Sequence, residues 1–251
     1  MQVGITSFGE SERLLFLRDV SSTVRMEGMR SDFVANVSHE LRTPLTVISG
    51  YLSTFLANAN DFPEPYLKPL QQMSVQAERM ESLVKDLLWL SRIESEELSE
   101  EHESVDIRGM LQELRDELKE AYPSSRIVLD LTTDARIKGN YRQLYSAVSN
   151  LVTNAIKYNI EDNPVTISWS EKGESYSLQV KDEGIGIDSI HIPRLSERFY
   201  RVDDSRNSVT GGTGLGLAIV KHVAAAHEAQ LNIESTLGEG SRFSLVFPAG
   251  G

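Results

Sequence analysis

Cysteine is absent from the 251-residue sequence, which excludes disulfide bonds, thiolate nucleophiles and Cys-ligated zinc or iron–sulfur sites. Histidine is scarce, and the five histidines lack the spacing of a metal-binding motif such as His-Glu-x-x-His. No run approaches the roughly 18 consecutive apolar residues that span a membrane, and residues 1–10 lack the basic start and apolar stretch of a signal peptide. We therefore expect this stretch of chain to lie in the cytoplasm without touching a membrane.

Positive charge is also in short supply. Lys and Arg total 25 against 37 Asp and Glu, which gives a formal net charge of −12. Such a balance disfavours sustained attraction to phosphate backbones, so we expect no nucleic-acid partner. Hydrophobic residues make up 40% of the chain, which is enough to bury a core. At about 150 residues per domain, the length predicts one or two domains, and we take two as the working number.

The first twenty residues predict two short strands, 2–7 and 13–19, joined by a turn at 8–11. An isolated hairpin of this size is marginally stable. It either docks on the rest of the chain or is the end of a domain that lies further upstream. We favour the second interpretation, because the chain runs directly from residue 19 into a helical pattern.

Two apolar stripes with helical spacing occupy residues 34–87. The first alternates spacings of four and three residues and comprises Val34, Ser38, Leu41, Leu45, Ile48, Leu52 and Phe55. The second alternates three and four and comprises Leu70, Met73, Ala77, Met80, Val84 and Leu87. Both are typical of supercoiled helices, and two prolines within residues 58–65 separate them into a helical hairpin. Because one hairpin has a single seam, we predict a homodimer in which two hairpins form a four-helix bundle.

A charged stretch at residues 94–103 has no apolar period. Beyond it, helices are expected at 107–121, 141–159 and 216–227. Strands are expected at 126–131, 135–138, 165–170, 176–182, 231–235 and 241–247. Because the strands alternate and the helices interleave irregularly, the pattern favours an α+β sandwich over a parallel doubly wound sheet. The predicted organisation is an upstream remnant at 1–20, the hairpin at 21–98, a linker at 99–104 and the α+β domain at 105–251.

The first helix contains the run SHELRTP at residues 38–44. His39 is one residue beyond the core stripe, so about 100° of helix rotation turns it away from the seam. Pro44 lacks an N–H and presses on the carbonyl of Glu40, so we expect a kink one turn beyond the histidine. Glu40 can hold one ring nitrogen of His39 protonated while the other attacks an electrophile. A His-Glu pair alone is usually an ordinary surface feature, so this interpretation depends on the other motifs.

Three further motifs could serve one ligand. The run NLVTNAIKY at 150–158 places two amides, an ammonium and an aromatic ring on one helical face. The run DEGIGI at 182–187 follows a strand, where the aspartate can accept a hydrogen bond and the glycines allow close backbone approach. The run GGTGLGL at 211–217 predicts a flexible loop before a helix whose first amides favour phosphate. A Rossmann fold would need a strand before these glycines, and a P-loop would need Lys-Ser/Thr after them.

Together with RFYR at 198–201, these motifs resemble, in order, the phosphoacceptor box and the four ATP-binding boxes of bacterial sensor histidine kinases. The similarity runs from residue 20 to residue 248. It implies a dimeric phosphoacceptor hairpin followed by a Bergerat-type ATP-binding sandwich, similar to that of gyrase and the ninety-kilodalton heat-shock chaperone. It also implies autophosphorylation of His39 from Mg-ATP and transfer of the phosphoryl group to an aspartate on the receiver domain of a response regulator.

The resemblance also implies which residues bind the cofactors ATP and Mg²⁺. They are Asn150, Asn154, Lys157, Tyr158, Asp182, Gly184, Gly186, Arg201, Gly212, Gly214, Leu215 and Gly216. Among them, Asn154 holds Mg²⁺, while Asn150 and Lys157 meet the phosphates. Tyr158 packs on the base, and Asp182 accepts from the adenine amine. Residues 211–216 form the hinge of a lid, and Arg201 contributes positive charge.

Within the phosphoacceptor box, Glu40 is the expected general base because it adjoins the imidazole of His39. Thr43 lies about one turn beyond His39 on the same face, so its hydroxyl can orient a water that removes the phosphoryl group from the regulator. The family resemblance agrees with this phosphatase role. The alternative is that Thr43 only tolerates the kinked backbone before Pro44.

Within the family, the sequence is closest to the phosphate-regulon sensor kinases, through residues 191–203 and the run NIES at 232–235. It departs from many relatives at Asn159 and in the run HEA at 227–229. The hairpin at 1–20 resembles the exit of a PAS sensor domain, which implies a larger sensor anchored in the bacterial inner membrane. Two other functions stay open: a signalling scaffold with an inactive nucleotide site, and a gyrase-like clamp ATPase that would have no use for His39.

Overall fold

A computed structural model describes residues 2–8, 12–18, 21–59, 62–95, 102–160, 163–202 and 212–248. Side chains in these ranges are described from residue 36 onward, except those of His39, Glu94 and Ser95. Residues 9–11 of the predicted first turn, residues 99–101 of the predicted linker, and Gly211 lie outside the described residues. The two N-terminal strands are present: β1 (Gln2–Phe8) pairs antiparallel with β2 (Glu12–Arg18).

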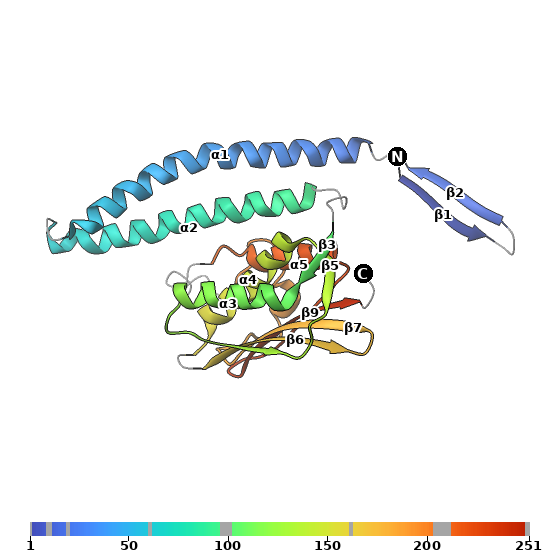
Figure 1. Ribbon diagram of the computed structural model, residues 1–251. Coiled ribbons are helices and arrows are strands. Elements are labelled where there is room, and N and C mark those ends of the chain that lie inside the picture. The colour runs from blue at the N-terminus through green and yellow to red at the C-terminus, as the bar shows by residue number, and fades with distance from the viewer. Residues whose placement is uncertain are drawn as a thin grey trace.

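The predicted helical hairpin consists of α1 (Ser21–Ala57) and α2 (Glu64–Ser95), which lie side by side (Figure 1). α1 continues through Pro44 and curves along its length (Figure 1). α2 has Pro65 in its first turn, where the missing N–H has no helical partner to lose. Leu52, Leu70 and Ala77 form a small apolar cluster that fixes the turn end of the hairpin.

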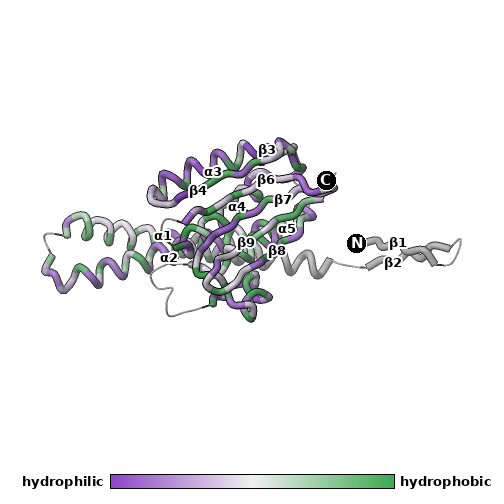
Figure 2. Tube along the Cα trace, turned by 90° about the horizontal axis from the view of Figure 1, so that it is seen from below, coloured by the Kyte–Doolittle hydropathy of each residue, from purple (hydrophilic) through white to green (hydrophobic). Residues whose placement is uncertain are grey.

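Each predicted apolar stripe contains buried and exposed positions, and Val84 and Leu87 of the second stripe are half-buried. The buried positions, seven residues apart within each helix, are Ser38, Leu45 and Leu52 in α1 and Leu70 and Ala77 in α2. The exposed positions, also seven apart, are Leu41, Ile48 and Phe55 in α1 and Met73 and Met80 in α2. Figure 2 shows apolar and polar positions alternating along the part of the hairpin that projects beyond the C-terminal domain. The hairpin thus covers the buried positions of each stripe and leaves the exposed positions as an apolar surface.

The C-terminal domain has one layer of strands and one of helices (Figure 1). The large sheet of the described residues has the order β4 (Arg126–Leu131), β6 (Pro164–Lys172), β7 (Ser175–Asp182), β9 (Gly240–Pro248) and β8 (Gln230–Thr236). β4 and β6 are parallel, and the other neighbours are antiparallel. The helices α3 (Ile107–Ala121), α4 (Tyr141–Tyr158) and α5 (Gly216–Ala226) lie between this sheet and α2 (Figure 1). This arrangement confirms the predicted α+β sandwich.

One strand was not predicted from the sequence. β3 (Glu103–Asp106) pairs antiparallel with β5 (Arg136–Gly139) as a separate two-stranded sheet. Two residues that the sequence analysis placed in the linker, Glu103 and Ser104, therefore pair with the C-terminal domain. β3 has four residues, and its one apolar residue, Val105, is buried. A single apolar residue cannot show the alternating pattern that predicts a strand.

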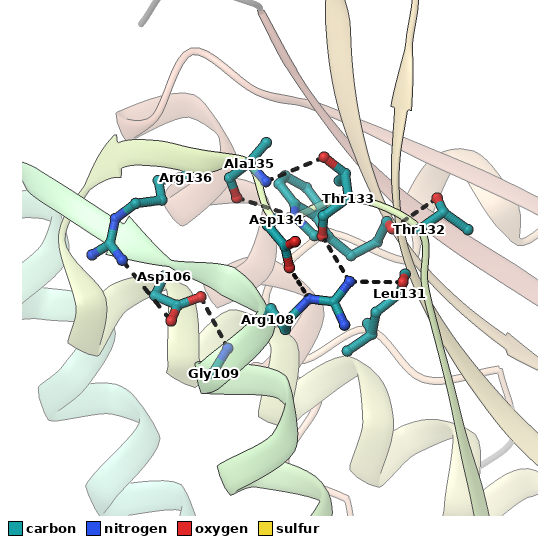
Figure 3. A network of polar contacts seen from close by, with 10 residues as sticks. Asp106, Arg108, Gly109, Leu131, Thr132, Thr133, Asp134, Ala135 and Arg136 are labelled. Atoms are coloured by element: carbon teal, nitrogen blue, oxygen red, sulfur yellow. Dashed lines mark hydrogen bonds and ion pairs between the residues drawn. The ribbon is translucent and has the colours of Figure 1, made fainter.

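A polar network connects β3 with the loop between β4 and β5 (Figure 3). Asp106 caps α3 by accepting the N–H of Gly109 at 3.0 Å. Arg108, in the first turn of α3, donates from Nη2 to the carbonyl of Leu131 at 2.8 Å and forms an ion pair with Asp134. These contacts connect the start of α3 to the chain that leads into β5.

The main apolar core lies between the helical layer and the sheet. Trp169 of β6 is fully buried there, and its indole N–H donates to the carbonyl of Ala135 at 3.2 Å. The same core extends to Leu90 and Ile93 of α2, so α2 packs on the C-terminal domain as well as on α1. Within the described residues, no helix is both long enough and apolar enough to span a bilayer.

Candidate nucleotide and phosphoacceptor site

α4 carries the run at 150–158, and its buried side fixes its rotation. The buried residues of this helix are Gln143, Leu144, Ala147, Val148, Leu151, Val152 and Ala155. Asn150 and Asn154 are half-buried beside this row, and Lys157 is exposed. Asn150 donates from Nδ2 to the carbonyl of Ser146 at 2.9 Å, which leaves its Oδ1 directed elsewhere. The face that the sequence analysis assigned to a ligand is therefore directed away from the core.

Asp182 ends β7 and is only 4% exposed. Its Oδ1 accepts the backbone N–H of Gly184 at 2.9 Å and that of Ser241 at 3.2 Å. Both described hydrogen bonds end on Oδ1, so Oδ2 keeps its lone pairs for a ligand. Burial raises the pKa of Asp182 above its usual range, and the two backbone hydrogen bonds oppose the rise. The carboxylate is thus a fixed acceptor that is suited to an amine on a bound base.

The first glycine loop packs against the last turn of α4. A Cβ on Gly184 would lie 2.1 Å from the carbonyl oxygen of Tyr158, and the same carbonyl accepts the N–H of Ile185 at 3.2 Å. Gly186 has a φ of +63°, and a Cβ there would lie 1.9 Å from the carbonyl oxygen of Thr236. Both positions therefore require glycine, the first because of close approach and the second also because of its backbone conformation.

The second glycine loop also lies against α4. A Cβ on Gly216, the first residue of α5, would lie 2.6 Å from Oδ1 of Asn150. Gly212 is also close to α4, since a Cβ there would lie 3.8 Å from the hydroxyl of Tyr158. The structure thus brings together the runs at 150–158 and 211–217, which are about sixty residues apart in the sequence.

The RFYR segment supports the second glycine loop. Phe199 donates its N–H to the carbonyl of Gly214 at 2.9 Å, and both residues have positive φ angles, +62° and +73°. A Cβ on Gly214 would lie 2.8 Å from Cα of Phe199, so the two segments touch through their backbones. Leu215 is fully buried in the core, where its side chain anchors the loop rather than facing a ligand. Arg201 is the last residue of this segment and is half-buried.

Two domain families match the chain. Residues 29–96 match the His Kinase A phospho-acceptor domain, and residues 139–251 match the histidine kinase-, DNA gyrase B- and HSP90-like ATPases. The first match spans the hairpin, and the second contains every glycine and asparagine of the site built above. The chain belongs to the sensor histidine kinases.

Two named relatives match almost the whole chain. The phosphate regulon sensor protein PhoR of Pseudomonas aeruginosa is 48% identical over 98% of this chain and 56% of its own length. The sensor-like histidine kinase SenX3 of Mycolicibacterium smegmatis is 40% identical over 94% of this chain and 62% of its own length. The chain therefore spans between half and two thirds of the length of these two relatives. The crystal structure of full-length ShkA in complex with AMPPNP superposes with a TM-score of 0.67 and 26% identity, over 86% of this chain and 45% of that one.

The phosphoacceptor box of this histidine kinase lies near the middle of α1. His39 is within the helix, but its side chain lies outside the described residues, so its predicted exposure remains a prediction. The side chains of Glu40 and Thr43 are exposed. Ser38 is 1% exposed on the opposite side, which agrees with a helix whose core stripe passes through this residue.

Sequence reasoning missed the contact between α2 and the second glycine loop. Thr213 donates its hydroxyl proton to Oδ2 of Asp86 at 2.7 Å. Burial raises the pKa of Asp86, while the hydrogen bond from Thr213 and the positive charges of Lys85 and Lys157 oppose the rise. Asp86 is therefore close to the face of α4 that carries the site. The spacing of apolar residues along α2 could not have predicted this contact, because Asp86 and Thr213 are 127 positions apart in the sequence.

The segment at 191–202 forms a compact polar unit beside the site. Nδ1 of His191 and the hydroxyl of Tyr200 share a hydrogen bond of 2.7 Å, and the guanidinium of Arg194 lies 4.2 Å from the centre of the Tyr200 ring. This geometry gives structural contacts to three residues of the run 191–203, namely His191, Arg194 and Tyr200. The unit precedes residues 203–211, which lie outside the described residues.

The residues present fit a nucleotide with a hydrated Mg²⁺. The described part of the chain contains no group of three or more His, Asp or Glu side chains that could hold a metal ion. Mg²⁺ usually binds few protein ligands and takes its other ligands from phosphate and water. The amide of Asn154, together with the close glycine approach at Gly216, suits such shared coordination. A metal site made only of protein side chains does not fit this arrangement.

Proposed function

We propose that the chain binds Mg-ATP between α4 and the two glycine loops and autophosphorylates His39. The observation that carries the proposal is the meeting of three separate motifs around α4, through Gly184 at one end and Gly216 beside Asn150. The phosphoacceptor box lies in the same chain, which supports a kinase rather than a clamp ATPase. All three motifs keep the residues expected to bind the nucleotide, which also argues against an inactive scaffold.

The proposed nucleotide contacts follow from the geometry. Oδ2 of Asp182 accepts from the adenine amine, because Oδ1 already accepts two backbone N–H groups. Tyr158 packs on the base, and Lys157 and Asn150 meet the phosphates near the start of α5, whose N-terminal amides favour negative charge. When bound to Asn154, Mg²⁺ would neutralise phosphate charge. Arg201 would add positive charge beside the second glycine loop.

In the proposed reaction, an imidazole nitrogen of His39 forms a bond to the γ-phosphorus as the bond from phosphorus to the bridging oxygen breaks. ADP leaves, and the ring proton passes to the carboxylate of Glu40. Figure 1 shows α2 between α1 and the C-terminal domain. The domain must therefore move relative to the hairpin, or serve the His39 of a second chain, before transfer occurs.

We infer that two chains pair through the exposed positions of the apolar stripes. These surfaces contain Leu41, Ile48 and Phe55 on α1 and Met73 and Met80 on α2. A four-helix bundle would bury them in its second seam. The match to a dimerising phosphoacceptor family supports this arrangement.

The acceptor of the phosphoryl group is proposed to be an aspartate on a response-regulator receiver domain. The similarity to PhoR favours phosphate-starvation signalling by a full-length protein that is anchored in the bacterial inner membrane. Thr43 is exposed on the phosphoacceptor helix, which supports its proposed role in orienting water for dephosphorylation of that regulator.

The chemical stability of a phosphorylated product tests this function. The chain is incubated with γ-labelled ATP and Mg²⁺, and the labelled protein is exposed to acid and to base. A phosphohistidine kinase gives a label that acid removes and base does not. An inactive scaffold gives no label, and a clamp ATPase releases labelled phosphate without labelling the protein.

A further inference from the structure

His227, at the end of α5, has a partner for each ring nitrogen although no motif assigns it a role. It is 6% exposed, and its Nδ1 lies 2.8 Å from the carbonyl oxygen of Val223. Its Nε2 accepts the backbone N–H of Asn140 at 2.9 Å. A carbonyl can only accept and a backbone N–H can only donate, so the proton must be on Nδ1 and absent from Nε2. The ring is therefore held as one neutral tautomer.

The surroundings of the ring belong to elements that are far apart in the sequence. Gly139 ends β5, and a Cβ there would lie 2.6 Å from Cδ2 of His227, so only glycine fits beneath the ring. Asn140 is the N-cap of α4. His102, which precedes β3, stacks on the other side with ring centres 5.2 Å apart and planes 8° apart. The imidazole thus connects the start of α4, the end of α5 and the chain that leads into β3.

We propose that His227 is a positioning residue for nucleotide binding, because its neutral imidazole fixes the start of α4 relative to α5. These two helices pack on each other beside the proposed site, where a Cβ on Gly216 of α5 would lie 2.6 Å from Oδ1 of Asn150 of α4. Asn150 lies ten residues, or about 15 Å, along α4 from the position that His227 holds. In this proposal, release of the start of α4 lets the helix tilt and displaces the amide of Asn150. The inference rests on the proposed ATP site.

Protonation of His227 disrupts this connection. The imidazolium has an N–H on both nitrogens, so its Nε2–H would face the N–H of Asn140, and neither group could accept. Burial lowers the pKa of His227, the hydrogen bond to Val223 opposes this, and the charge of His102 lowers the pKa further. Among the described titratable groups of β5, α4, α5 and the segment before β3, His102 is the one whose charge acts on the ring. The connection is therefore intact at neutral pH and is lost in acid, below the usual histidine value of about 6.5.

The test compares the pH dependence of nucleotide affinity between the unmodified chain and His227→Gln. A glutamine oxygen can accept the Asn140 N–H but cannot be protonated in this range. Mg-ATP affinity is measured by calorimetry from pH 8 down to the lowest pH at which both proteins stay folded by circular dichroism. The nucleotide's own titration affects both proteins alike. The ratio of their dissociation constants therefore reports only the effect of His227 protonation on Mg-ATP affinity. We expect this ratio to change about fivefold or more in favour of His227→Gln at the acidic end, as the loss of one hydrogen bond predicts.

His222→Gln, on the same helix, is the matched control and should keep the unmodified pH profile. His227→Leu should weaken Mg-ATP binding at every pH, with folding checked by circular dichroism. An unchanged pH profile in His227→Gln would overturn the proposal. Nitrogen NMR of His227 gives a second readout that does not require nucleotide. The proposal requires the Nδ1-H tautomer at pH 8, and an Nε2-H tautomer would contradict it even if the chain did not bind ATP.

Discussion

Two substitutions of Asp182 can distinguish its contribution to the stability of the fold from its contribution to recognition of the base. Its two carboxylate oxygens differ in their partners. Oδ1 accepts the backbone N–H groups of Gly184 and Ser241, and Oδ2 has no described protein partner. Asp182→Asn can keep an amide oxygen in the Oδ1 position while it places an NH₂ group at the ligand. Asp182→Ala removes both oxygens.

The expected magnitudes differ for the two variants. In Asp182→Ala, two buried N–H groups lose their acceptor, and each costs about 1–3 kcal/mol, so the free energy of unfolding should fall by about 2–6 kcal/mol. In Asp182→Asn those bonds persist and the burial of a charge is relieved, so stability should stay within about 1 kcal/mol. Its ATP affinity should nevertheless fall by about 1.5–3 kcal/mol, or roughly 10–150-fold, because a charged acceptor is lost.

The assay combines urea unfolding with calorimetric titration of ATP and of inosine triphosphate. Inosine has a carbonyl where adenine has its amine, so the NH₂ group of Asp182→Asn should favour inosine triphosphate over ATP. The unmodified chain should show the opposite preference. Wild-type ATP affinity in Asp182→Asn would refute the reasoning and move the base to another part of the domain.

Three further substitutions test other parts of the site and the hairpin. Gly184→Ala would place a Cβ 2.1 Å from the carbonyl oxygen of Tyr158. Calorimetry should therefore show weaker ATP binding, and thermal unfolding should show that the free energy of unfolding falls by about 1–3 kcal/mol. Unchanged binding and stability would contradict the close approach. Met80→Glu, at an exposed position of the hairpin, should give a folded monomer by light scattering and circular dichroism, and a persistent dimer would place the seam elsewhere. Thr43→Ala should retain labelling of His39 but slow dephosphorylation of the regulator, and equal loss of both activities would indicate a structural role.

Local patterns in the sequence account for most of the fold. The helix at 107–121 has a strong apolar period and an N-cap at Asp106, so its bounds agree with α3. β3 was missed because its four residues contain one apolar side chain, and its pairing with β5 decides its conformation. The stripes in α1 and α2 predicted the hairpin, but the spacing alone could not show which positions of each stripe the single chain buries.

The site was predictable to the extent that its residues lie in compact motifs. Gly184 and Gly216 both lie against α4, the first at Tyr158 and the second at Asn150, and Asp182 accepts the N–H of Gly184. The contact between Asp86 and Thr213 and the bond from Asn140 to His227 join distant elements. Thr213 lies in the glycine run at 211–217, but neither that run nor the sequence around the other three residues indicates the partner, so only tertiary packing reveals these contacts.

Site-specific labelling of His39 tests the central claim most directly. His39→Gln and the unmodified chain are compared for Mg-ATP binding by calorimetry and for incorporation of the γ-phosphoryl group in the same preparation. The account predicts equal ATP affinity in the two proteins and complete loss of the acid-labile label in His39→Gln. Persistent labelling of His39→Gln would contradict the account, because it would place the phosphoryl group on another residue.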